Sequence, residues 1–248
     1  KVKFLHLPKV DVPKISVVDK LFFGKSLTEK KIPISSYTIS GNGLVYFPYQ
    51  SEQEQKYQGD FKILEQTYWF GTDTFGRDLL SRILYGIRIS LAVGFIAVFI
   101  SLIIGISLGL LAGYFRGRTD DVIMWFVNVV WSIPTLLMVI AITLALGKGF
   151  WQVFVAVGLT MWVEVARIVR GQVLYIRELE YVEAGKALAY KPFRIIFKHI
   201  LPNVIGPVIV ISAANFAAAI LIEAGLSFLG IGVQPPMPSW GGMIKDHY

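Results

Sequence analysis

Four long stretches without a charged residue most strongly constrain what this chain can fold into. They cover residues 89–113, 122–147, 149–163 and 203–222. An α-helix rises about 1.5 Å per residue, so about 20 apolar residues cross the hydrocarbon core of a bilayer. Three stretches reach this length, and the third reaches it by continuing past Glu164 toward the basic residues Arg167 and Arg170, which can snorkel. The pattern predicts transmembrane spans at about residues 89–113, 122–147, 149–169 and 203–225.

The composition also favours a membrane protein. Only 17% of the 248 residues are charged, whereas soluble domains average about 25%. The absence of cysteine excludes disulfides, zinc-thiolate sites and cysteine nucleophiles. The three histidines, His6, His199 and His247, are too far apart for a local metal motif, so we expect no metal site and no cofactor.

The net charge of +7 would suit a nucleic-acid partner, but the distribution of Lys and Arg suits membrane topology better, and we expect no nucleic acid. Residues 167–199 hold seven basic side chains against three acidic ones, and Arg116 and Arg118 follow the first span. Only Lys148 separates the second and third spans. The positive-inside rule therefore places residues 114–121 and 167–202 in the cytoplasm and residues 1–88 outside.

Residues 1–70 differ from the rest because they are polar, rich in Lys and interrupted by Pro and Gly. Short β-branched or aromatic runs at Ile34–Ile39 and Gly43–Phe47 predict strands joined by a turn. We expect an extramembrane segment here. The chain starts without Met and ends just after a loop, so we also expect a fragment cut at both ends.

Small residues recur every four positions in two of the spans. Such strips let the backbone of another helix approach closely and predict a packed bundle. They comprise Ser101, Gly105, Gly109 and Gly113 in the first span, and Ala213, Ala214, Ala217 and Ala218 in the fourth.

Three further residues in the spans have both a functional and a structural interpretation. Pro134 removes a helical hydrogen bond and predicts a kink, which serves either gating or shape. Glu164 is a carboxylate in a span, but Arg167 lies one turn away and predicts a local ion pair. Glu223 lies near the outer end of its span, and for both acids a packing role stands beside a functional one.

The most informative stretch is residues 178–203, between the third and fourth spans. Its first half predicts a short helix with small residues on one side, at Ala184, Gly185 and Ala187. A break follows at residues 190–192, and Pro192 is well placed to open a second helix. Such a short amphipathic element suits either docking in a partner's groove or resting on lipid headgroups.

This stretch resembles the EAA loop of ABC importer permeases, in which Glu-Ala-Ala is followed by three residues, Gly, nine residues and Ile-x-Leu-Pro. Gly185 stands in place of the second Ala, Ala189 in place of the Gly, and His199 in place of the Ile. If the Gly position is left-handed, Ala189 costs about 1 kcal/mol or more, or the turn shifts by one residue. The ATPase-coupling residues that the resemblance implies are Glu183, Ala184, Gly185, Ala187, Ala189, Leu201 and Pro202.

Two more segments resemble dipeptide, oligopeptide and nickel permeases in particular. Residues 71–78, with Leu80, Ser81 and Arg82, resemble the segment before the second membrane helix. Residues 223–230, with residues 235–241, resemble the end of the fifth helix and the loop after it. The resemblance covers about residues 68–245. Its signature positions are Gly71, Thr72, Asp73, Gly76, Arg77, Asp78 and Glu223.

The resemblance implies an all-α polytopic membrane fold, a transmembrane helix bundle of the ABC importer permease type. An irregular, β-containing extracytoplasmic segment would occupy residues 1–70, and the permease domain residues 71–248, with a cytoplasmic coupling loop at 170–202. Family members have six spans, and those visible here would be the second to the fifth.

The resemblance also implies the partners. They are a second permease subunit in the lipid bilayer, two cytoplasmic ABC ATPase subunits and an extracytoplasmic substrate-binding protein, at a bacterial inner (plasma) membrane. The implied function is import of di- and oligopeptides, with the helix around Glu183 as the coupling helix.

Other functions were weighed against this one. Gly24-Lys25-Ser26 resembles the end of a P-loop, but the required earlier Gly falls on Asp19, so we expect no ATPase site and no enzyme. A nickel or other small-solute ABC importer stays open, although nickel would favour His ligands and the spans contain none. A secondary transporter or channel would want paired acids or broken helices at the membrane midplane, and the sequence offers only Glu164 and Glu223.

Overall fold

The computed structural model describes residues 2–8, 29–40, 43–49, 51, 53–73, 76–147, 149–233 and 237–247. The chain divides into two compact units, one formed by Lys1–Ile89 with Pro235–Tyr248 and the other by Ser90–Gln234. Residues 24–26, the P-loop-like triplet, and Pro235-Pro236 lie outside the described residues.

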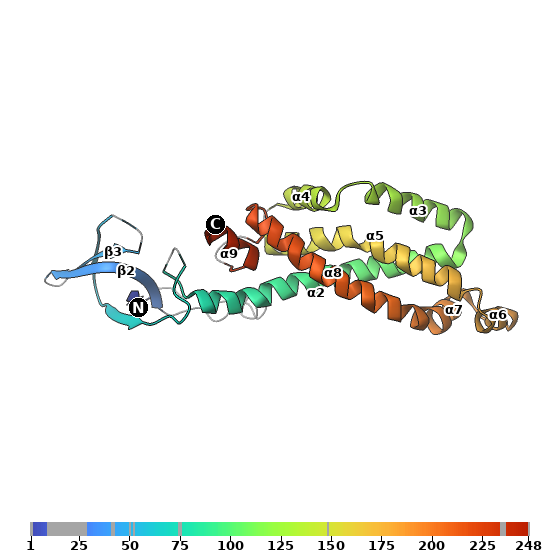
Figure 1. Ribbon diagram of the computed structural model, residues 1–248, viewed down its shortest axis with the longest axis horizontal. Helices are drawn as coiled ribbons and strands as arrows, with labels where there is room; N and C mark the ends of the chain where they lie inside the picture. The colour runs from blue at the N-terminus through green and yellow to red at the C-terminus, as the bar shows by residue number, and fades with distance from the viewer. Residues whose placement is uncertain are drawn as a thin grey trace. The chain divides into compact units, whose positions relative to one another are not determined.

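The first unit contains a five-stranded antiparallel sheet in the order β4-β3-β2-β1-β5 (Figure 1). Its core is formed by Leu5, Leu7, Ile34, Leu44 and Tyr46. The two strands predicted from sequence are confirmed, because they lie within β2 and β3. The strands are β1 (Val2–Pro8), β2 (Glu29–Ser40), β3 (Gly43–Pro48), β4 (Gln55–Gln58) and β5 (Lys62–Gln66).

The rest of the described chain is helical. The helices are α2 (Leu79–Phe115), α3 (Gly117–Trp131), α4 (Thr135–Leu146), α5 (Phe150–Ile176), α6 (Glu180–Ala187), α7 (Pro192–Ile195), the π-helical turn η1 (Ile196–Ile200), α8 (Leu201–Phe228) and α9 (Trp240–His247). Among the described residues, three helical stretches are long and apolar enough to cross a membrane: Leu79–Phe115, Phe150–Ile176 and Pro192–Phe228. Three of the four predicted spans therefore fall in such helices.

Within the second predicted span, the kink expected at Pro134 is instead a complete break between two helices. Helix α3 ends at Trp131 and α4 starts at Thr135, with an angle of 88° between them. Pro134 has an extended backbone (φ −55°, ψ 124°) rather than a helical one. A proline also disfavours helical geometry at the residue before it, so the two effects together end α3 instead of merely bending it. The pair α3–α4 is thus either a broken span or a re-entrant element.

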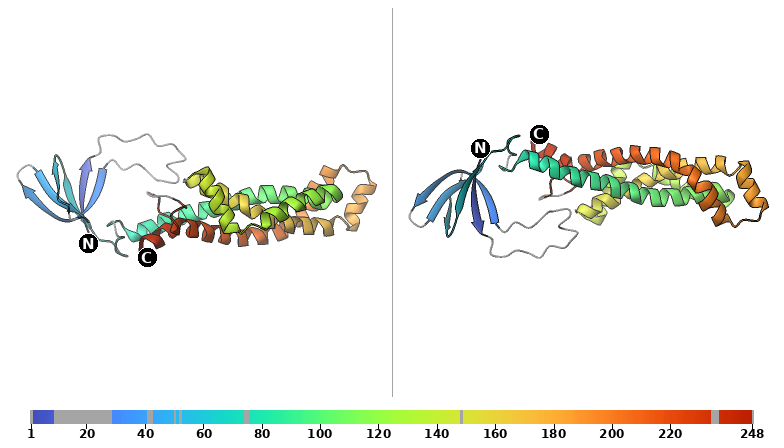
Figure 2. Two further views of the ribbon diagram at one scale, coloured as in Figure 1. Left: turned by 90° about the horizontal axis from the view of Figure 1, so that it is seen from above. Right: turned by 90° about the horizontal axis from the view of Figure 1, so that it is seen from below.

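The small-residue strip of the first span forms a close helix contact, as predicted. A Cβ atom added to Gly105 would lie 2.6 Å from the Val165 Cβ, and one added to Gly109 would lie 2.7 Å from the Ala166 carbonyl oxygen. Gly113 approaches the Val173 Cβ in the same way. Because real Cβ atoms need more room, only glycine lets the backbones of α2 and α5 come this close. Figure 2 shows α2, α5 and α8 running alongside one another.

The alanine strip of α8 behaves differently. Ala213, Ala214 and Ala217 are exposed, and only Ala218 packs against the core of the second unit. The buried face of α8 instead carries Val204, Val208, Asn215, Ala219, Glu223, Leu226 and Ser227.

Candidate functional site

The two short helices predicted from the sequence lie between α5 and α8. They are separated by residues 188–191, and the second starts at Pro192. Helix α6 begins after Leu179 and carries Glu180 and Glu183 in its first turn, where acidic side chains complement the helix dipole. Helix α7 opens with Pro192 at its first position, as expected.

Helix α6 ends in a Schellman turn centred on Ala189. The Tyr190 amide donates to the Gly185 carbonyl oxygen at 3.0 Å, and the Ala189 amide donates to the Lys186 carbonyl oxygen at 2.9 Å. These two bonds define the motif, and its left-handed position is Ala189, with φ of 53°. Of the two alternatives drawn from the sequence, the turn has not shifted, and Ala189 adopts the conformation that glycine favours.

The loop is anchored by apolar side chains that join it to the ends of α5 and α8. Val182 and Ile200 are fully buried and Ile195 nearly so, in one cluster with Val173 and Val204. Gly185 is also buried, and a Cβ there would lie 3.5 Å from the Tyr190 ring and 3.9 Å from Ile195, which is ordinary contact. The anchored face of α6 therefore fixes which side of the helix faces outward.

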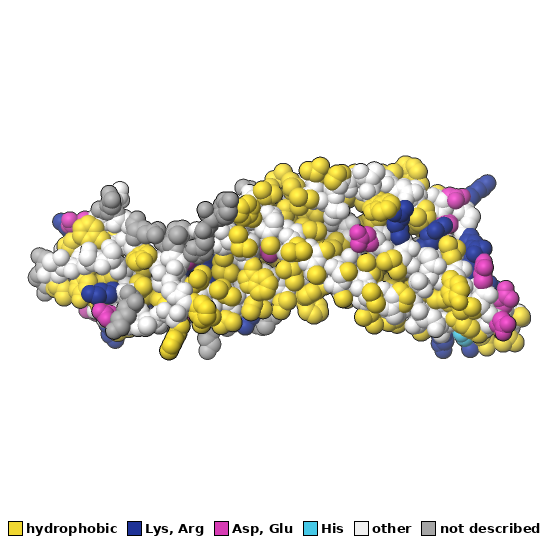
Figure 3. Space-filling view, in the orientation of Figure 1, with side chains coloured by type: hydrophobic (Ala, Val, Ile, Leu, Met, Phe, Trp, Pro, Cys, Tyr) yellow, Lys and Arg dark blue, Asp and Glu magenta, His cyan; other side chains and the backbone are white. Residues whose placement is uncertain are grey.

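The outward side combines acidic, small and apolar residues. Glu183, Ala184, Ala187 and Ala189 are exposed, as are the large side chains of Leu188, Phe193 and Phe197, which are 65%, 66% and 57% exposed. Leu201 is half-buried and Pro202 exposed at the start of α8. Figure 3 shows charged side chains gathered at the end of the helical unit where Figure 1 places α6 and α7. This is a surface with several uncovered apolar side chains beside charges.

Two basic residues make contacts that hold this surface in place, and neither contact was predicted from the sequence. The Arg177 Nη1 donates to the Tyr114 carbonyl oxygen at 2.6 Å, which ties the start of the loop to the end of α2. The Arg194 guanidinium lies 4.0 Å from the ring centre of Tyr190, and His199 stacks on the same ring at 6.0 Å. Arg177 and Tyr114 are 63 positions apart, so no local pattern signals their contact.

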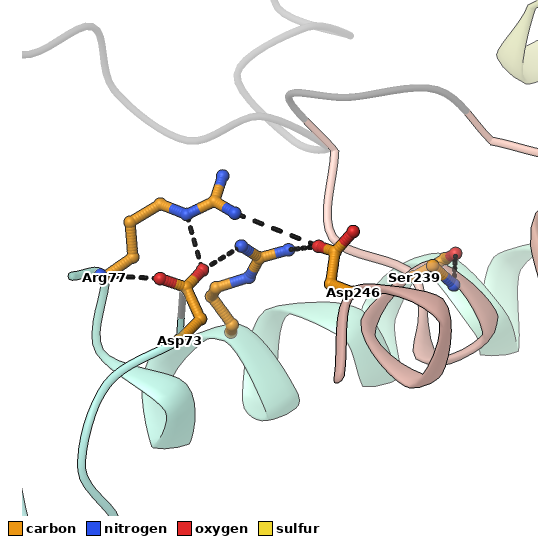
Figure 4. Close-up of polar contacts among 6 residues, drawn as sticks. Asp73, Arg77, Ser239 and Asp246 are labelled. Atoms are coloured by element: carbon orange, nitrogen blue, oxygen red, sulfur yellow. Dashed lines mark hydrogen bonds and ion pairs between the residues drawn. The ribbon is translucent and has the colours of Figure 1, made fainter. Parts of the chain in front are cut away.

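The signature residues before α2 form a tight turn organised by one buried aspartate (Figure 4). Asp73 is 3% exposed; its Oδ1 accepts from the Arg77 amide at 2.8 Å, and its Oδ2 accepts from the Arg77 Nε at 2.6 Å. Arg82 also pairs with this carboxylate, and Asp246 of α9 lies 3.5 Å from Arg82. A network of ion pairs centred on Asp73 therefore holds this turn together within the first unit.

The remaining signature residues of this turn have backbone roles. Gly71 and Gly76 have φ of 74° and 71°, which side-chain-bearing residues rarely adopt. Thr72 and Asp78 form an isolated antiparallel bridge, and the Asp78 carboxylate accepts from the Ser81 amide at 3.3 Å. This contact caps α2.

Glu223 is fully buried near the end of α8. The Ser227 hydroxyl donates to the Glu223 Oε1 at 2.6 Å, and the Val233 amide donates to the same hydroxyl oxygen at 3.1 Å. The predicted ion pair of Glu164 with Arg167, in contrast, was wrong. Arg167 instead stacks 3.6 Å from the Trp131 ring centre and donates to the Asn128 Oδ1 at 3.1 Å.

The structure thus gathers the EAA-like residues at one end of the second unit, whereas Gly71–Asp78 lie in the first unit. Within the described residues, no group of three His, Asp or Glu side chains is arranged to hold a metal ion.

Comparison with known proteins identifies related chains. Residues 105–248 match the family described as binding-protein-dependent transport system inner membrane component. The oligopeptide permease OppC of Bacillus subtilis (strain 168) is 44% identical over 179 residues, which cover 72% of this chain and 59% of that protein. The dipeptide permease DppC of the same organism is 48% identical over 72% of this chain and 56% of that protein.

A glutathione permease, GsiD of Pectobacterium atrosepticum, is 39% identical over 80% of this chain and 66% of that protein. The chain therefore spans roughly three fifths of the length of these relatives.

A solved structure described as an inward-facing MetNI methionine ABC transporter shares the fold. Its TM-score is 0.57 at 20% identity, over 62% of this chain and 77% of that chain. With the family match covering more than half of its residues, this chain belongs to the binding-protein-dependent transport system inner membrane components.

Proposed function

We propose that this chain is part of a membrane-spanning permease subunit of an ATP-binding-cassette importer that carries peptides across a bacterial inner membrane. The observation that carries the proposal is the α6–α7 loop, whose anchored inner face leaves Glu183 and its small neighbours pointing outward. A short helix held rigidly between two apolar helices can transmit a partner's movement to both of them.

The charge distribution supports a cytoplasmic position for this loop. Arg116, Arg177, Lys186 and Arg194 lie at this end of the helical unit, and short loops rich in Lys and Arg stay in the cytoplasm. Residues 1–70 then lie on the outer side, where a binding protein delivers its cargo. The coupling residues proposed on this basis are Glu183, Ala184, Gly185, Ala187, Ala189, Leu201 and Pro202.

The helix surfaces support partners within the bilayer. Helix α8 exposes Ile205, Ile209, Val210 and Leu221, together with the alanine strip described above. Apolar side chains suit lipid, and a strip of small residues suits close approach by another helix. We assign these surfaces to the bilayer and to a second permease subunit, and the exposed apolar residues of the loop to two cytoplasmic ATPase subunits.

The cargo is proposed from the relatives, which are named as oligopeptide, dipeptide and glutathione permeases. Nickel or another small solute is the alternative within the same class of importer. ATP hydrolysis is assigned to the partner subunits.

Reversal of the charge at Glu183 tests the coupling role. Glu183→Lys places a cation on the exposed face without altering the buried anchors Val182 and Gly185. We expect normal membrane insertion but at least a tenfold loss of ATP-driven peptide uptake, because a like or unpaired charge at an interface costs about 1.4 kcal/mol or more. The matched control is Glu65→Lys in β5, which changes an exposed carboxylate of the sheet and should leave uptake unchanged. Uptake at the wild-type rate in Glu183→Lys would count against the proposal.

A further inference from the structure

A cavity lies where the bent pair α3–α4 meets α5 and α8, within the second unit. Its volume is about 200 Å³. The walls are mostly apolar and include Trp131, Met138, Met161, Ala218 and Ile222. Four polar side chains also line it: Thr135, Thr160, Glu164 and Asn215. The right-angled break at Pro134 produces this geometry, because a straight helix would not turn α4 away from the end of α3.

Asn215 is the first of two features that point to a ligand. Its side chain is 2% exposed, and its Nδ2 has no hydrogen-bond partner among the described residues. Buried amide donors are almost always paired, because an unpaired one loses its bonds to water without replacement. An acceptor oxygen placed in the cavity would satisfy this donor.

Glu164 is the second feature. It lies within an apolar candidate span, and no basic side chain in the described parts of the chain forms an ion pair with it. The nearest candidate in sequence, Arg167, is held by Trp131 and Asn128 instead. A carboxylate in a membrane span is costly unless it has a partner, so it marks a functional position. A cationic group would pair with it.

The cavity therefore offers one buried neutral donor, Asn215, between apolar walls, and one anionic acceptor, Glu164, whose side chain is exposed. The amino-terminal residue of a peptide presents the complementary pair, an α-ammonium group and the carbonyl oxygen next to it. The volume corresponds to roughly seven water molecules at about 30 Å³ each. Whole-ligand pockets are usually about 300–1,000 Å³, so this one suits a single residue rather than an entire oligopeptide.

We propose that this cavity binds the amino-terminal residue of a transported peptide. The Glu164 carboxylate accepts hydrogen bonds from the α-ammonium group, and the Asn215 Nδ2 donates to the adjacent carbonyl oxygen. The apolar walls hold the side chain by contact alone, which tolerates many sequences. The choice of a peptide as the ligand rests on the proposed function.

The test is direct binding to the purified, assembled transporter in the absence of the binding protein. Isothermal titration compares trialanine with N-acetyl-trialanine, which keeps the carbonyl groups and lacks the ammonium group. The wild type should bind trialanine at least about tenfold more tightly, since a hydrogen bond to a charged group contributes that much or more.

Variants assign the two contacts separately. Glu164→Gln should abolish the preference for trialanine while leaving the affinity for N-acetyl-trialanine unchanged. Asn215→Leu, of similar size, should weaken binding of both peptides by the same factor. Glu65→Gln in β5 is the control and should behave as the wild type. Equal binding of the two peptides by the wild type, or a preference that persists in Glu164→Gln, overturns the proposal, as does undiminished binding in Asn215→Leu.

ATP-driven uptake of trialanine in vesicles separates this site from the proposed function. If the wild type takes up no trialanine but its preference for trialanine over N-acetyl-trialanine disappears in Glu164→Gln, the binding site is supported and the importer role is contradicted. If the wild type takes up trialanine but Glu164→Gln still prefers trialanine to N-acetyl-trialanine, the proposed binding site is wrong and the importer role is supported.

Discussion

Replacement of Ala189 by glycine should stabilise the turn that ends α6. Ala189 has φ of 53°, a conformation that costs a residue with a Cβ about 1–2 kcal/mol. Glycine avoids this cost but loses roughly 0.5–1 kcal/mol more conformational entropy on ordering. The net gain is therefore about 0.8 kcal/mol, or roughly a fourfold smaller equilibrium constant for local opening.

Hydrogen–deuterium exchange of the assembled transporter measures this opening directly. The amides of Ala189 and Tyr190 donate the two hydrogen bonds of the turn, so they exchange only when it opens. In Ala189→Gly we expect about fourfold slower exchange at these amides. The matched control, Ala187→Gly, makes the same chemical change at a helical position and should accelerate exchange instead, since glycine costs up to about 1 kcal/mol there.

Exchange as fast as the wild type, or faster, in Ala189→Gly would refute the reasoning. It would mean that the turn has shifted by one residue and that Ala189 is not the left-handed position. The sign of the Ala187→Gly effect shows in the same experiment that the method resolves changes of this size.

The remaining predictions concern three other positions. Gly185→Ala should slow exchange throughout α6 by a factor of two to five, because helix propensity improves by roughly 0.5–1 kcal/mol and the new Cβ makes only ordinary contacts. Gly109→Ala should lower the thermal unfolding midpoint and the yield of monodisperse protein, since overpacking against the Ala166 carbonyl oxygen costs about 1–3 kcal/mol. The control Gly171→Ala, which has open space around it, should lower neither the midpoint nor the yield. Asp73→Asn should lower the unfolding midpoint and expose the turn before α2 to protease, because it removes the buried partner of Arg82 at a cost of roughly 2 kcal/mol or more; the exposed Asp60→Asn should change neither.

Local sequence patterns located three of the long apolar helices, although α2 starts ten residues before the predicted span. Uncharged runs located α2, α5 and α8, since an apolar helix of about 20 residues is long enough to cross the hydrocarbon core of a bilayer. The position of Pro192 at the start of α7 and the glycine strip facing α5 also followed from local rules.

Other features depend on residues far apart in the chain and were not predictable from local patterns. Strand β1 pairs with both β2 and β5, and its five-stranded sheet emerges only from those distant pairings. Arg177 reaches the Tyr114 carbonyl oxygen across 63 positions, and Arg167 prefers Trp131 on α3 over its neighbour Glu164.

Whether the helix bends or breaks at Pro134 also could not be predicted from the sequence. A proline in an apolar run is compatible with a bent helix or with two separate helices, and the choice depends on what packs on either side. Here α4 packs against α5 and the helix is interrupted. The cavity that contains Glu164 and Asn215 follows from that interruption. From the sequence alone, Arg167 was the expected partner of Glu164, and no pattern singled out Asn215.

The central proposal is that this chain is part of a permease that imports peptides, driven by ATP hydrolysis in partner subunits. The most direct measurement is uptake and ATP hydrolysis by the full-length permease, assembled in vesicles with its partner permease, ATPases and a binding protein loaded with short peptides or with nickel. We predict peptide-stimulated hydrolysis coupled to peptide uptake. Stimulation by nickel alone would contradict the assigned cargo, and uptake driven by an ion gradient without ATP would contradict the importer mechanism itself.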